Sequence, residues 1–256
     1  MFEQKEINTR YGNMLIFTED PTIGKALDLY GEYCHSEIEL IKNYTDKTSF
    51  FIDVGANIGT HSIGVAPNVK RVLAFEPNLE NFNLLTKNCA LNMRKNISCS
   101  QLAFSSEVSK TNTKFNFGKT TLCEGNDVIV TTLDSISDIP SIDFIKIDVR
   151  GMEYDVLKGA ERSINYFQPK LLIKMQHQEL YGKIYDLLKN LNYNIYWFNV
   201  ATYTTDNHKQ NKEDIFGPEH GVLNWFALQG TVNTLNPVID KNDSIERLNH
   251  RKTYDI

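Results

Sequence analysis

A glycine-containing turn follows one of the apolar runs of this chain and combines residue types that suit close contact with a ligand. The run covers residues 50–54, and the sequence reads DVGANIGT over residues 53–60. Glycine directly after a buried strand lets the backbone approach a ligand, and the N-terminus of a following helix favours electron-rich groups. The carboxylate of Asp53 lies just before the turn, where it suits a cationic ligand better than an anionic one. This spacing predicts a ligand site after the first strand of a sheet.

An acidic residue lies at the offset from this turn at which nucleotide sites commonly hold a ribose. Glu76 follows the apolar run 71–75 and comes 21 residues after Gly55. In nucleotide-binding βαβ units, an acidic side chain about 20 residues after the glycine turn accepts hydrogen bonds from ribose hydroxyls. The turn and Glu76 together predict a nucleoside pocket at the carboxyl edge of the sheet.

The kind of nucleoside depends on what the turn lacks. A dinucleotide site uses the pattern G-x-G-x-x-G, whereas Asn57 and Thr60 break that pattern here and remove the close backbone approach to a pyrophosphate. Asp53 suits the ammonium and sulfonium of S-adenosylmethionine better than the pyrophosphate of NAD. The residues therefore favour the methyl donor. A nicotinamide-dependent oxidoreductase and a tight turn without a ligand are the alternatives.

Asp148 lies in the apolar run 143–149 and is the polar residue best placed to assist chemistry at the same edge. Methyl transfer is a displacement at carbon, so aligning acceptor and donor supplies most of the acceleration, and a base removes the acceptor proton. A free carboxylate with a pKa of about 4 is a weak base for an alcohol, so orientation is the expected role. A helix cap is the alternative reading of Asp148, and His61 and His177 are alternative bases.

The elements that must position these residues alternate between strands and helices. We expect strands at 50–54, 71–75, 97–103, 143–149 and 171–173, and helices at 58–66, 79–93, 154–166 and 180–191. The helical segments repeat apolar residues every three or four positions, whereas the strands are short apolar runs. Residues 194–198 and 223–228 are expected to close the sheet as an antiparallel pair. This alternation predicts an open, doubly wound α/β sheet.

The chain divides into three expected parts: an N-terminal cover over 1–48, a main domain over 49–230, and a polar C-terminal tail over 231–256. The cover is expected to hold one strand, at 14–17, and one amphipathic helix from Pro21 to Ile41. Residues 104–127 are polar and aperiodic, which predicts a loop with short edge structure. The polar segment 199–222 predicts a substrate lid or a surface excursion.

Composition limits the class of protein. The 256 residues are 41% hydrophobic, enough for a core, and 27 basic against 32 acidic residues give a net charge of −5. That balance argues against a nucleic-acid partner. The N-terminus lacks a secretory apolar run and no stretch suits a membrane helix, so we expect a cytoplasmic protein with no membrane partner. Four cysteines without C-x-x-C spacing predict reduced, buried thiols, and no ligand set predicts a metal.

Several motifs in order resemble one family, the FkbM family of S-adenosylmethionine-dependent methyltransferases. The segments are FIDVGANIGTHS at 51–62, AFEPN at 74–78, TLDS at 132–135, FIKIDV at 144–149, GMEY at 151–154, VLKGA at 156–160 and NWFA at 224–227. The main resemblance runs from Ser49 to Met175, about half of the chain. It implies a class I methyltransferase (Rossmann-like) fold, doubly wound, with a mostly parallel seven-stranded sheet, and methyl transfer to an oxygen of a small molecule or sugar.

The resemblance also implies roles for individual residues. The methionine end of S-adenosyl-L-methionine would be held by Asp53, Gly55, Asn57 and Gly59, and its ribose by Glu76. The backbone around Leu102 and Ala103 would line the adenine. Asp148 would face the transferring methyl group and is the expected catalytic residue.

Two positions depart from the family pattern, and both place a base where the family usually has an acid. The family reads Asp-Val-Glu-Gly where this chain has Arg150 as the third residue, and its fifth strand usually ends in an acid where this chain has Lys174. Two cations at the carboxyl edge predict an anionic acceptor, such as an acidic sugar, bound by Arg150 and Lys174 with His177 nearby. Surface exposure of both side chains and a non-catalytic, ligand-binding domain of the same fold are the alternatives.

Overall fold

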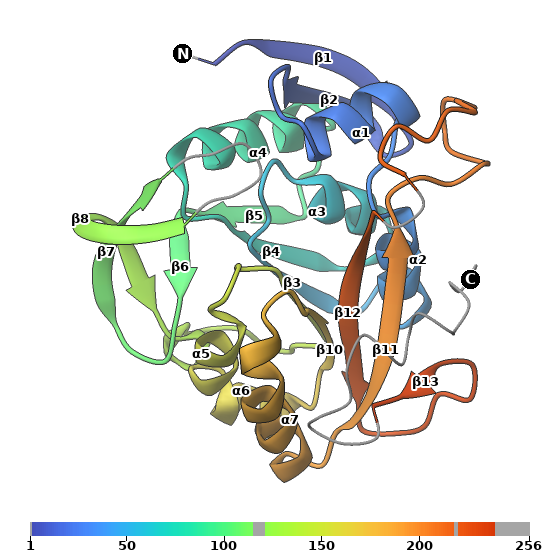
Figure 1. The fold of residues 1–256 in the computed structure, drawn as a ribbon. Coiled ribbons are helices and arrows are strands. Elements are labelled where there is room, and N and C mark those ends of the chain that lie inside the picture. Colours follow the sequence, from blue (N-terminus) through green and yellow to red (C-terminus); the bar gives the residue numbers. More distant parts are fainter. Residues whose placement is uncertain (1, 115–120, 218–219, 239–256) are drawn as a thin grey trace.

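A mixed β-sheet forms the centre of the structure, with the strand order β13-β11-β12-β10-β9-β3-β4-β5 (Figure 1). The structure is a computed structural model and describes residues 2–114, 121–217 and 220–238. The strands are β3 (Phe50–Val54), β4 (Arg71–Phe75), β5 (Ile97–Ser100), β9 (Phe144–Ile147), β10 (Lys170–Lys174), β11 (Asn194–Ala201), β12 (Gly221–Leu228) and β13 (Asn236–Pro237). Neighbours from β10 to β5 pair in parallel, and β12 is antiparallel to both β10 and β11. The expected doubly wound α/β sheet and its antiparallel closing pair are confirmed.

Helices cover both faces of this sheet. They are α1 (Ile23–Tyr30), α2 (His35–Asn43), α3 (Thr60–Val65), α4 (Leu79–Leu91), α5 (Glu153–Lys158), α6 (Glu161–Phe167) and α7 (Tyr181–Asn190), with short 3₁₀ turns η1 (Ala66–Asn68), η2 (Leu133–Ser135) and η3 (Gln178–Leu180). Successive strand residues point to opposite faces, so Phe51 packs in one core with α1 to α4, and Ile52 packs in the other with α5 to α7. Both faces are buried, as the apolar strands require.

The sheet has eight strands in the described part of the chain, not the seven that the family resemblance implied. The additional strand is β13, whose two residues pair with Tyr196 and Trp197 of β11. It lies in the expected tail at 231–256, of which residues 239–256 are outside the described part. A two-residue strand of Asn and Pro carries no alternation of apolar residues, so no sequence pattern predicts it.

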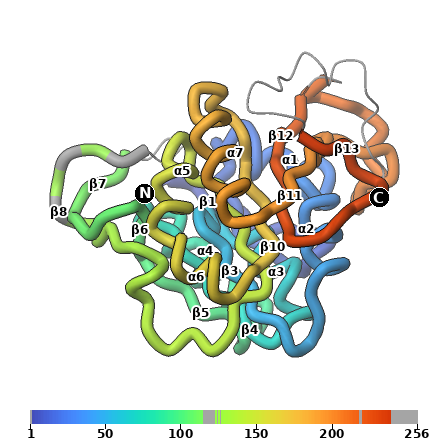
Figure 2. The backbone as a smooth tube through the Cα atoms, turned by 90° about the horizontal axis from the view of Figure 1, so that it is seen from below, coloured from blue at the N-terminus to red at the C-terminus, as the bar shows by residue number. Residues whose placement is uncertain are grey.

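A second, three-stranded sheet occupies the region expected to be a loop. It consists of β6 (Leu102–Phe104), β7 (Ser109–Lys114) and β8 (Thr121–Thr131) in the order β6-β8-β7, and β7 and β8 extend away from the main body (Figure 2). The expected strand at 97–103 is therefore wrong as one element, since β5 belongs to the main sheet and β6 to this one. The side chains of β7 are exposed or half-buried, so its residues are polar and show no buried face.

The N-terminal cover contains a hairpin and two helices, where one strand and one helix were expected. The hairpin pairs β1 (Gln4–Thr9) with β2 (Gly12–Phe17). The single helix from Pro21 to Ile41 is wrong because Gly31, at a φ of 70°, ends α1 in the left-handed conformation. The apolar positions on either side of the break still pack into one core, since Leu27 and Ile38 are fully buried.

The helix expected at 154–166 is also interrupted, between α5 and α6. At the break, a Cβ added to Gly159 would lie 2.0 Å from the carbonyl oxygen of Ser105. The backbone of Gly159 also accepts a hydrogen bond from the N–H of Asp134 at 2.9 Å. This close backbone approach joins the break between α5 and α6 to the chain that follows β6.

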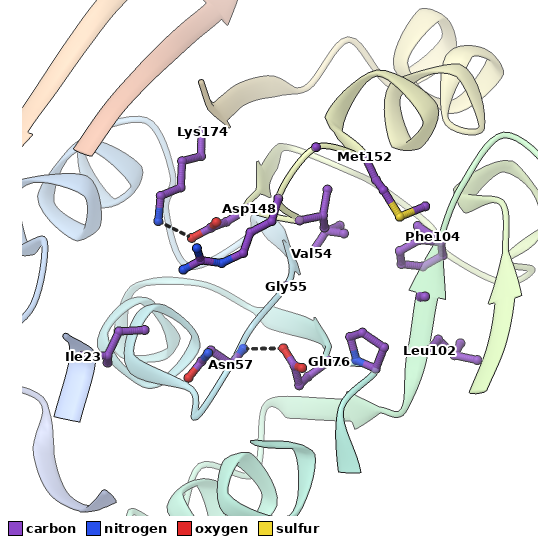
Figure 3. A pocket seen from close by; sticks show the side chains of 15 residues that line it. Ile23, Val54, Gly55, Asn57, Glu76, Leu102, Phe104, Asp148, Met152 and Lys174 are labelled. Atoms are coloured by element: carbon purple, nitrogen blue, oxygen red, sulfur yellow. Dashed lines mark hydrogen bonds and ion pairs between the residues drawn. The ribbon is translucent and has the colours of Figure 1, made fainter. Parts of the chain in front are cut away.

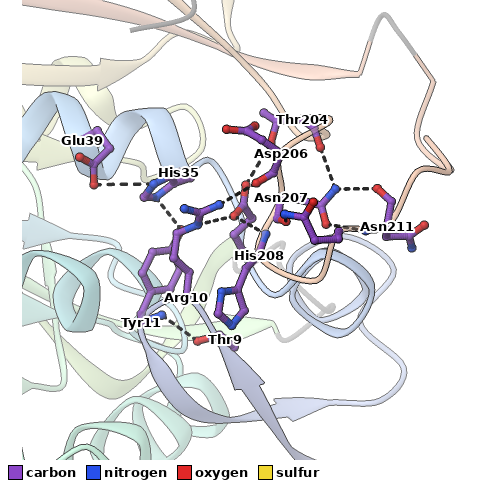
Figure 4. Close-up of polar contacts among 12 residues, drawn as sticks. Thr9, Arg10, Tyr11, His35, Glu39, Thr204, Asp206, Asn207, His208 and Asn211 are labelled. Carbon is purple, nitrogen blue, oxygen red and sulfur yellow. Dashed lines mark hydrogen bonds and ion pairs between the residues drawn. The ribbon is translucent and has the colours of Figure 1, made fainter.

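The long segment after β11 packs on the N-terminal cover (Figure 4). The carboxylate of Glu32, which is 3% exposed, accepts hydrogen bonds from Arg10 at 2.6 Å, from the Thr204 hydroxyl at 3.1 Å and from the His208 backbone N–H at 3.0 Å. The hydroxyl of Tyr30 adds bonds to the backbone of Glu213 and Ile215. Hydrogen bonds therefore hold the described residues of 199–222 against the N-terminal cover, at the surface of the protein.

Two further expectations concern membrane-spanning helices and cysteine thiols. None of the helices in the described ranges has the length and hydropathy to cross a membrane. All four cysteines are free; Cys34 and Cys89 are buried, whereas Cys99 and Cys123 are only half-buried, so the expectation of buried thiols holds for two of them.

The contact at Gly159 predicts an asymmetric response of two glycines to alanine. Gly159→Ala should lower the free energy of unfolding by about 1–3 kcal/mol, because the new methyl group must displace backbone. Gly182→Ala in α7 is the matched control, since no atom lies within 4 Å of its added Cβ. It should be neutral or stabilising by up to about 1 kcal/mol. Urea denaturation measures both; equal effects would contradict the packing at Gly159.

Candidate active site

A pocket opens at the carboxyl ends of the central parallel strands (Figure 3). Its lining comes from the ends of β3, β4, β9 and β10, from β6 and from the start of α1. The lining residues are Ile23, Val54, Gly55, Asn57, Glu76, Pro77, Leu102, Ala103, Phe104, Asp148, Val149, Arg150, Gly151, Met152 and Lys174. In open α/β sheets this edge is where ligands bind, at a point where the strand order reverses. Here the reversal falls between β3 and β9.

Glu76 is a buried carboxylate at the pocket wall, immediately after β4. It is 3% exposed and accepts hydrogen bonds from the backbone N–H of Asn57 at 2.9 Å and of Asn78 at 3.0 Å. Burial is the largest influence on its acidity and raises its pKa to about 7, against the lowering effect of these backbone donors. The carboxylate therefore joins the glycine turn to the start of α4. Further hydrogen-bond donors in the pocket would stabilise its ionised form.

The glycine turn passes very close to the chain that leaves β9. Gly55 has a φ of 82°, and a Cβ added to it would lie 2.0 Å from the carbonyl oxygen of Asp148. Asn57 also has a positive φ, 51°, and its backbone N–H points to Glu76. Gly59 caps the N-terminus of α3 and is not among the residues that line the pocket. A Cβ added to Gly59 would lie 2.7 Å from the side chain of Leu85. The turn thus places Gly55 and Asn57 at the pocket and Gly59 behind them.

One wall of the pocket is apolar and could enclose a flat ring. Leu102, Ala103 and Phe104 come from β6, and Pro77 and Met152 flank them. Figure 3 shows Leu102, Phe104 and Met152 on one side of the pocket and Lys174 on the opposite side. The Glu76 carboxylate can accept hydrogen bonds from a ribose, and the apolar wall beside it can pack against a purine, so this part of the pocket fits an adenosyl group.

A chain of alternating charges lies at the polar side of the pocket and continues into the core. The Lys146 Nζ lies 3.3 Å from Asp53 and 4.0 Å from Asp148, and the Lys174 Nζ lies 2.9 Å from Asp148. We call these four residues the ion cluster. They come together because Asp53 and Lys146 are register partners on β3 and β9, and the face that carries Phe51 and Phe144 also carries them.

The ion cluster stabilises the charged forms of Asp148 and Lys146. Burial alone would raise the pKa of Asp148, but the positive charges of Lys174 and Lys146 outweigh it and hold that pKa well below its usual range. Burial likewise disfavours the Lys146 ammonium, but the carboxylates of Asp53 and Asp148 raise its pKa above the ordinary value. Asp148 is therefore an anion at every physiological pH. It can accept hydrogen bonds in the pocket but is a poor proton acceptor.

A second buried pair, Glu37 and His61, lies close enough to the ion cluster to interact with it electrostatically. The carboxylate of Glu37 on α2 lies 2.8 Å from the His61 Nε2 and accepts a hydrogen bond from the Asn224 side chain at 2.9 Å. Burial acts to raise the pKa of Glu37, yet His61 and the two lysines of the ion cluster lower it. His61 is 7% exposed and lies outside the pocket lining, so its geometry suits a structural contact rather than a base.

The structure brings together most of the expected site residues. Gly55, Asn57, Glu76, Ala103, Asp148, Arg150 and Lys174 all line the pocket. Asp53 and Gly59 do not, and the Asp53 carboxylate is fully buried between Lys146 and the Ser62 hydroxyl. That Asp53 and Gly59 hold the methionine end therefore stays a prediction, and neither residue lines the pocket in this structure. His177 lies beside the pocket: a Cβ on Gly151 would be 3.4 Å from its ring, which pairs with Glu179 at 3.2 Å.

Two site features were missed from the sequence. Ile23 of α1 lines the pocket, which the patterns of residues could not have placed because the contact is long-range. Lys146 is the other, and a signal for it was present. A lysine in the apolar run of β9 has to find an acidic partner when that strand is buried, and Asp53 was the acid in the neighbouring run. Among the described residues, no group of three or more His, Cys, Asp or Glu side chains could hold a metal ion.

The ion cluster predicts that Lys146 is a large contributor to stability. Lys146→Met should lower the free energy of unfolding by about 3–5 kcal/mol, because it leaves two buried carboxylates without their cation. Lys158→Met is the control: its ion pair with Glu161 is about 40% exposed on both sides and should contribute at most about 1 kcal/mol. Asp53→Asn should restore part of the stability of Lys146→Met. If the double variant is no more stable, the pairing of Asp53 with Lys146 is contradicted.

Known proteins resemble this chain over its central part. The family described as "Methyltransferase FkbM domain" matches residues 53–195. A curated relative, the hexuronic acid methyltransferase AglP of Haloferax volcanii, is 32% identical over 157 residues, which are 56% of this chain and 64% of the relative. The chain therefore spans less than two thirds of the length of that relative.

Solved structures resemble the fold. The methyltransferase FkbM from Methylobacillus flagellatus KT has 22% identity and a TM-score of 0.48, covering 71% of this chain and 44% of that chain. A putative rRNA-methylase from Clostridium thermocellum has 10% identity and a TM-score of 0.50, covering 78% of this chain and 98% of that chain. Together with the sheet order, the likeness to the Clostridium thermocellum structure agrees with the expected class I fold.

Proposed function

Because this chain belongs to the FkbM family of methyltransferases, we propose that it transfers a methyl group from S-adenosylmethionine to a hydroxyl oxygen of a small molecule or sugar. One observation carries the cofactor assignment. The buried Glu76 carboxylate lies at the pocket wall, with the apolar residues Leu102, Ala103 and Phe104 beside it. A carboxylate there accepts two ribose hydroxyls, while the apolar slot takes the purine.

The glycine turn and the ion cluster suit the other end of the same ligand. Gly55 leaves no side chain between the backbone and the pocket, and Asn57 offers an amide there. The Asp53 carboxylate is fully buried, so its influence on the pocket is indirect: it holds Lys146, which in turn lies 4.0 Å from Asp148. Ile23 of α1 also lines the pocket, so the N-terminal cover contributes one side chain to it.

The proposed reaction depends on alignment more than on proton transfer. Bound S-adenosylmethionine supplies an electrophilic methyl group on a sulfonium. The Asp148 carboxylate, which is 22% exposed to the pocket, accepts a hydrogen bond from the acceptor hydroxyl and orients its oxygen. The oxygen–carbon bond forms as the carbon–sulfur bond breaks, and the hydroxyl proton is released to water. The Lys174 ammonium, 2.9 Å from Asp148, keeps that carboxylate in one position.

An acidic sugar is the acceptor class that we propose. The curated relative is named as a hexuronic acid methyltransferase, and this chain has Arg150 and Lys174 at the side of the pocket away from the apolar slot. Both cations favour an acceptor that carries a carboxylate.

Removing the charge of Glu76 should weaken cofactor binding. In Glu76→Gln, the dissociation constants of S-adenosylmethionine and S-adenosylhomocysteine should rise about 10- to 100-fold, because hydrogen bonds to a carboxylate exceed those to a neutral amide. Glu161→Gln, a half-exposed glutamate on α6 outside the pocket, makes the same change of charge and should have no effect. Isothermal titration calorimetry measures all three proteins. Unchanged affinity in Glu76→Gln, or tighter binding of NAD than of S-adenosylmethionine, contradicts the proposal.

Cofactor affinity should also depend on pH through Glu76. Its pKa of about 7 means that the carboxyl of the ligand-free protein becomes protonated as the pH falls below 7. Ribose hydroxyls are best accepted by the ionised form, so the apparent dissociation constant should rise about tenfold between pH 7.5 and pH 6. Glu76→Gln should lose this part of the pH dependence. A wild-type profile parallel to that of the variant would show that Glu76 does not titrate against the ligand.

A further inference from the structure

Two cationic side chains, Arg150 and Lys174, line the pocket and a third, Lys146, is buried next to it, but the three are not equivalent. Lys146 lies between Asp53 and Asp148, and Lys174 donates a hydrogen bond to Asp148 at 2.9 Å. Within the described ranges, Arg150 forms no ion pair and no hydrogen bond. The two acids and two lysines of the ion cluster pair with one another, so Arg150 is the cation on the Asp148 side of the pocket that has no partner of its own among the described residues.

The backbone presents Arg150 at the pocket by an uncommon turn. Arg150 and Gly151 have φ values of 54° and 94°, and an arginine in the left-handed region is unusual. The carboxylate of Glu153 accepts the backbone N–H of Gly151 at 2.9 Å and holds the turn from behind. Arg150 is half-buried, lines the pocket, and lies close enough to lower the pKa of Asp148.

On these grounds we propose that Arg150, and not Lys174, binds the carboxylate of the acceptor and thereby selects acidic sugars over neutral ones. The inference rests on the proposed function, since it takes the Asp148 side of the pocket as the acceptor side. A planar guanidinium without a partner can hold a carboxylate through two parallel hydrogen bonds. Lys174 already donates a hydrogen bond to Asp148 at 2.9 Å and is only 8% exposed, so little of its ammonium is open to a ligand. Arg150 is thus a specificity-determining residue, while Lys174 is a positioning residue for Asp148.

The cationic cofactor strengthens the argument for an anion at this place. S-adenosylmethionine brings a sulfonium into a pocket that already holds the uncompensated guanidinium of Arg150. An acceptor carboxylate beside Arg150 compensates that charge, whereas a neutral sugar leaves it unpaired in a partly desolvated site. A neutral acceptor is therefore disfavoured even where its hydroxyl has the same position.

The test compares uronic acids with their neutral counterparts. Glucuronate, galacturonate and mannuronate, and the matching hexoses, are titrated into wild-type protein and Arg150→Gln by calorimetry, with and without S-adenosylhomocysteine. Release of S-adenosylhomocysteine from S-adenosylmethionine gives KM and kcat for the same pairs. We expect at least one uronate to bind wild-type protein better than its hexose, and Arg150→Gln to weaken that uronate about 10- to 100-fold in Kd or KM. Its hexose should be unaffected.

Two variants separate a specific contact from a general effect. Arg162→Gln on α6 removes the same charge from a side chain that is 81% exposed and outside the pocket, and should leave uronate binding unchanged. Arg150→Lys should recover only part of the uronate affinity, because an ammonium lacks the bidentate geometry.

Each other result overturns the inference. Equal losses for uronate and hexose in Arg150→Gln, or no binding of any of the three uronates to wild-type protein, show that Arg150 does not select the acid. A rise in the Kd of S-adenosylmethionine in Arg150→Gln, with uronate binding retained, shows that the guanidinium holds the carboxylate of the cofactor. If S-adenosylmethionine itself fails to bind, the proposed function fails separately, and the titrations without cofactor still decide the role of Arg150.

Discussion

A lysine ammonium buried inside the central sheet is the constraint on which the rest of this site depends. Lys146 is 4% exposed and belongs to β9, where its neighbours along the strand are apolar. An isolated charge at such a place would be very unfavourable, so the fold has to supply carboxylates within a few ångströms. Asp53 on β3 and Asp148 after β9 supply them, and they can do so only if these strands are paired in the observed register.

This requirement organises the pocket in two halves. Asp148 is fixed at the polar side by Lys146 and Lys174, which also keep it ionised. Glu76 lies at the other side, next to the apolar residues of β6, and its pKa is raised by burial. The two carboxylates therefore differ in charge state and in role. Under the proposed function, Glu76 accepts the ribose hydroxyls of the cofactor while Asp148 orients the reacting hydroxyl of the acceptor.

Much of the fold follows from short-range patterns, and the exceptions have physical reasons. Glu76 could be placed from its offset to Gly55, because a strand, a turn and a helix fix that distance. Breaks at Gly31 and Gly159 were not predicted, since the apolar stripe continues across both. The sheet β6-β8-β7 was predicted only as a loop with short edge structure, because its outer strand β7 is polar and exposed and no face of it carries an apolar alternation.

The same distinction applies to the site. Residue types indicated which side chains gather at the carboxyl edge, but not which of them already have partners. The sequence does not show that Asp53 and Lys174 form ion pairs, as they do in the structure. Nor does it show that Arg150 has no partner among the described residues. Pairing depends on register and side-chain direction across three strands, which a single sequence does not encode locally.

The most direct test of this account is a crystal structure of the protein with S-adenosylhomocysteine. The account predicts ribose hydroxyls within hydrogen-bond distance of Glu76, the purine against Leu102 to Phe104, and the homocysteine end beside Gly55 and Asn57. It also predicts that the Arg150 guanidinium stays open to the remaining part of the pocket. A ligand bound elsewhere, or one whose ribose does not reach Glu76, would contradict it.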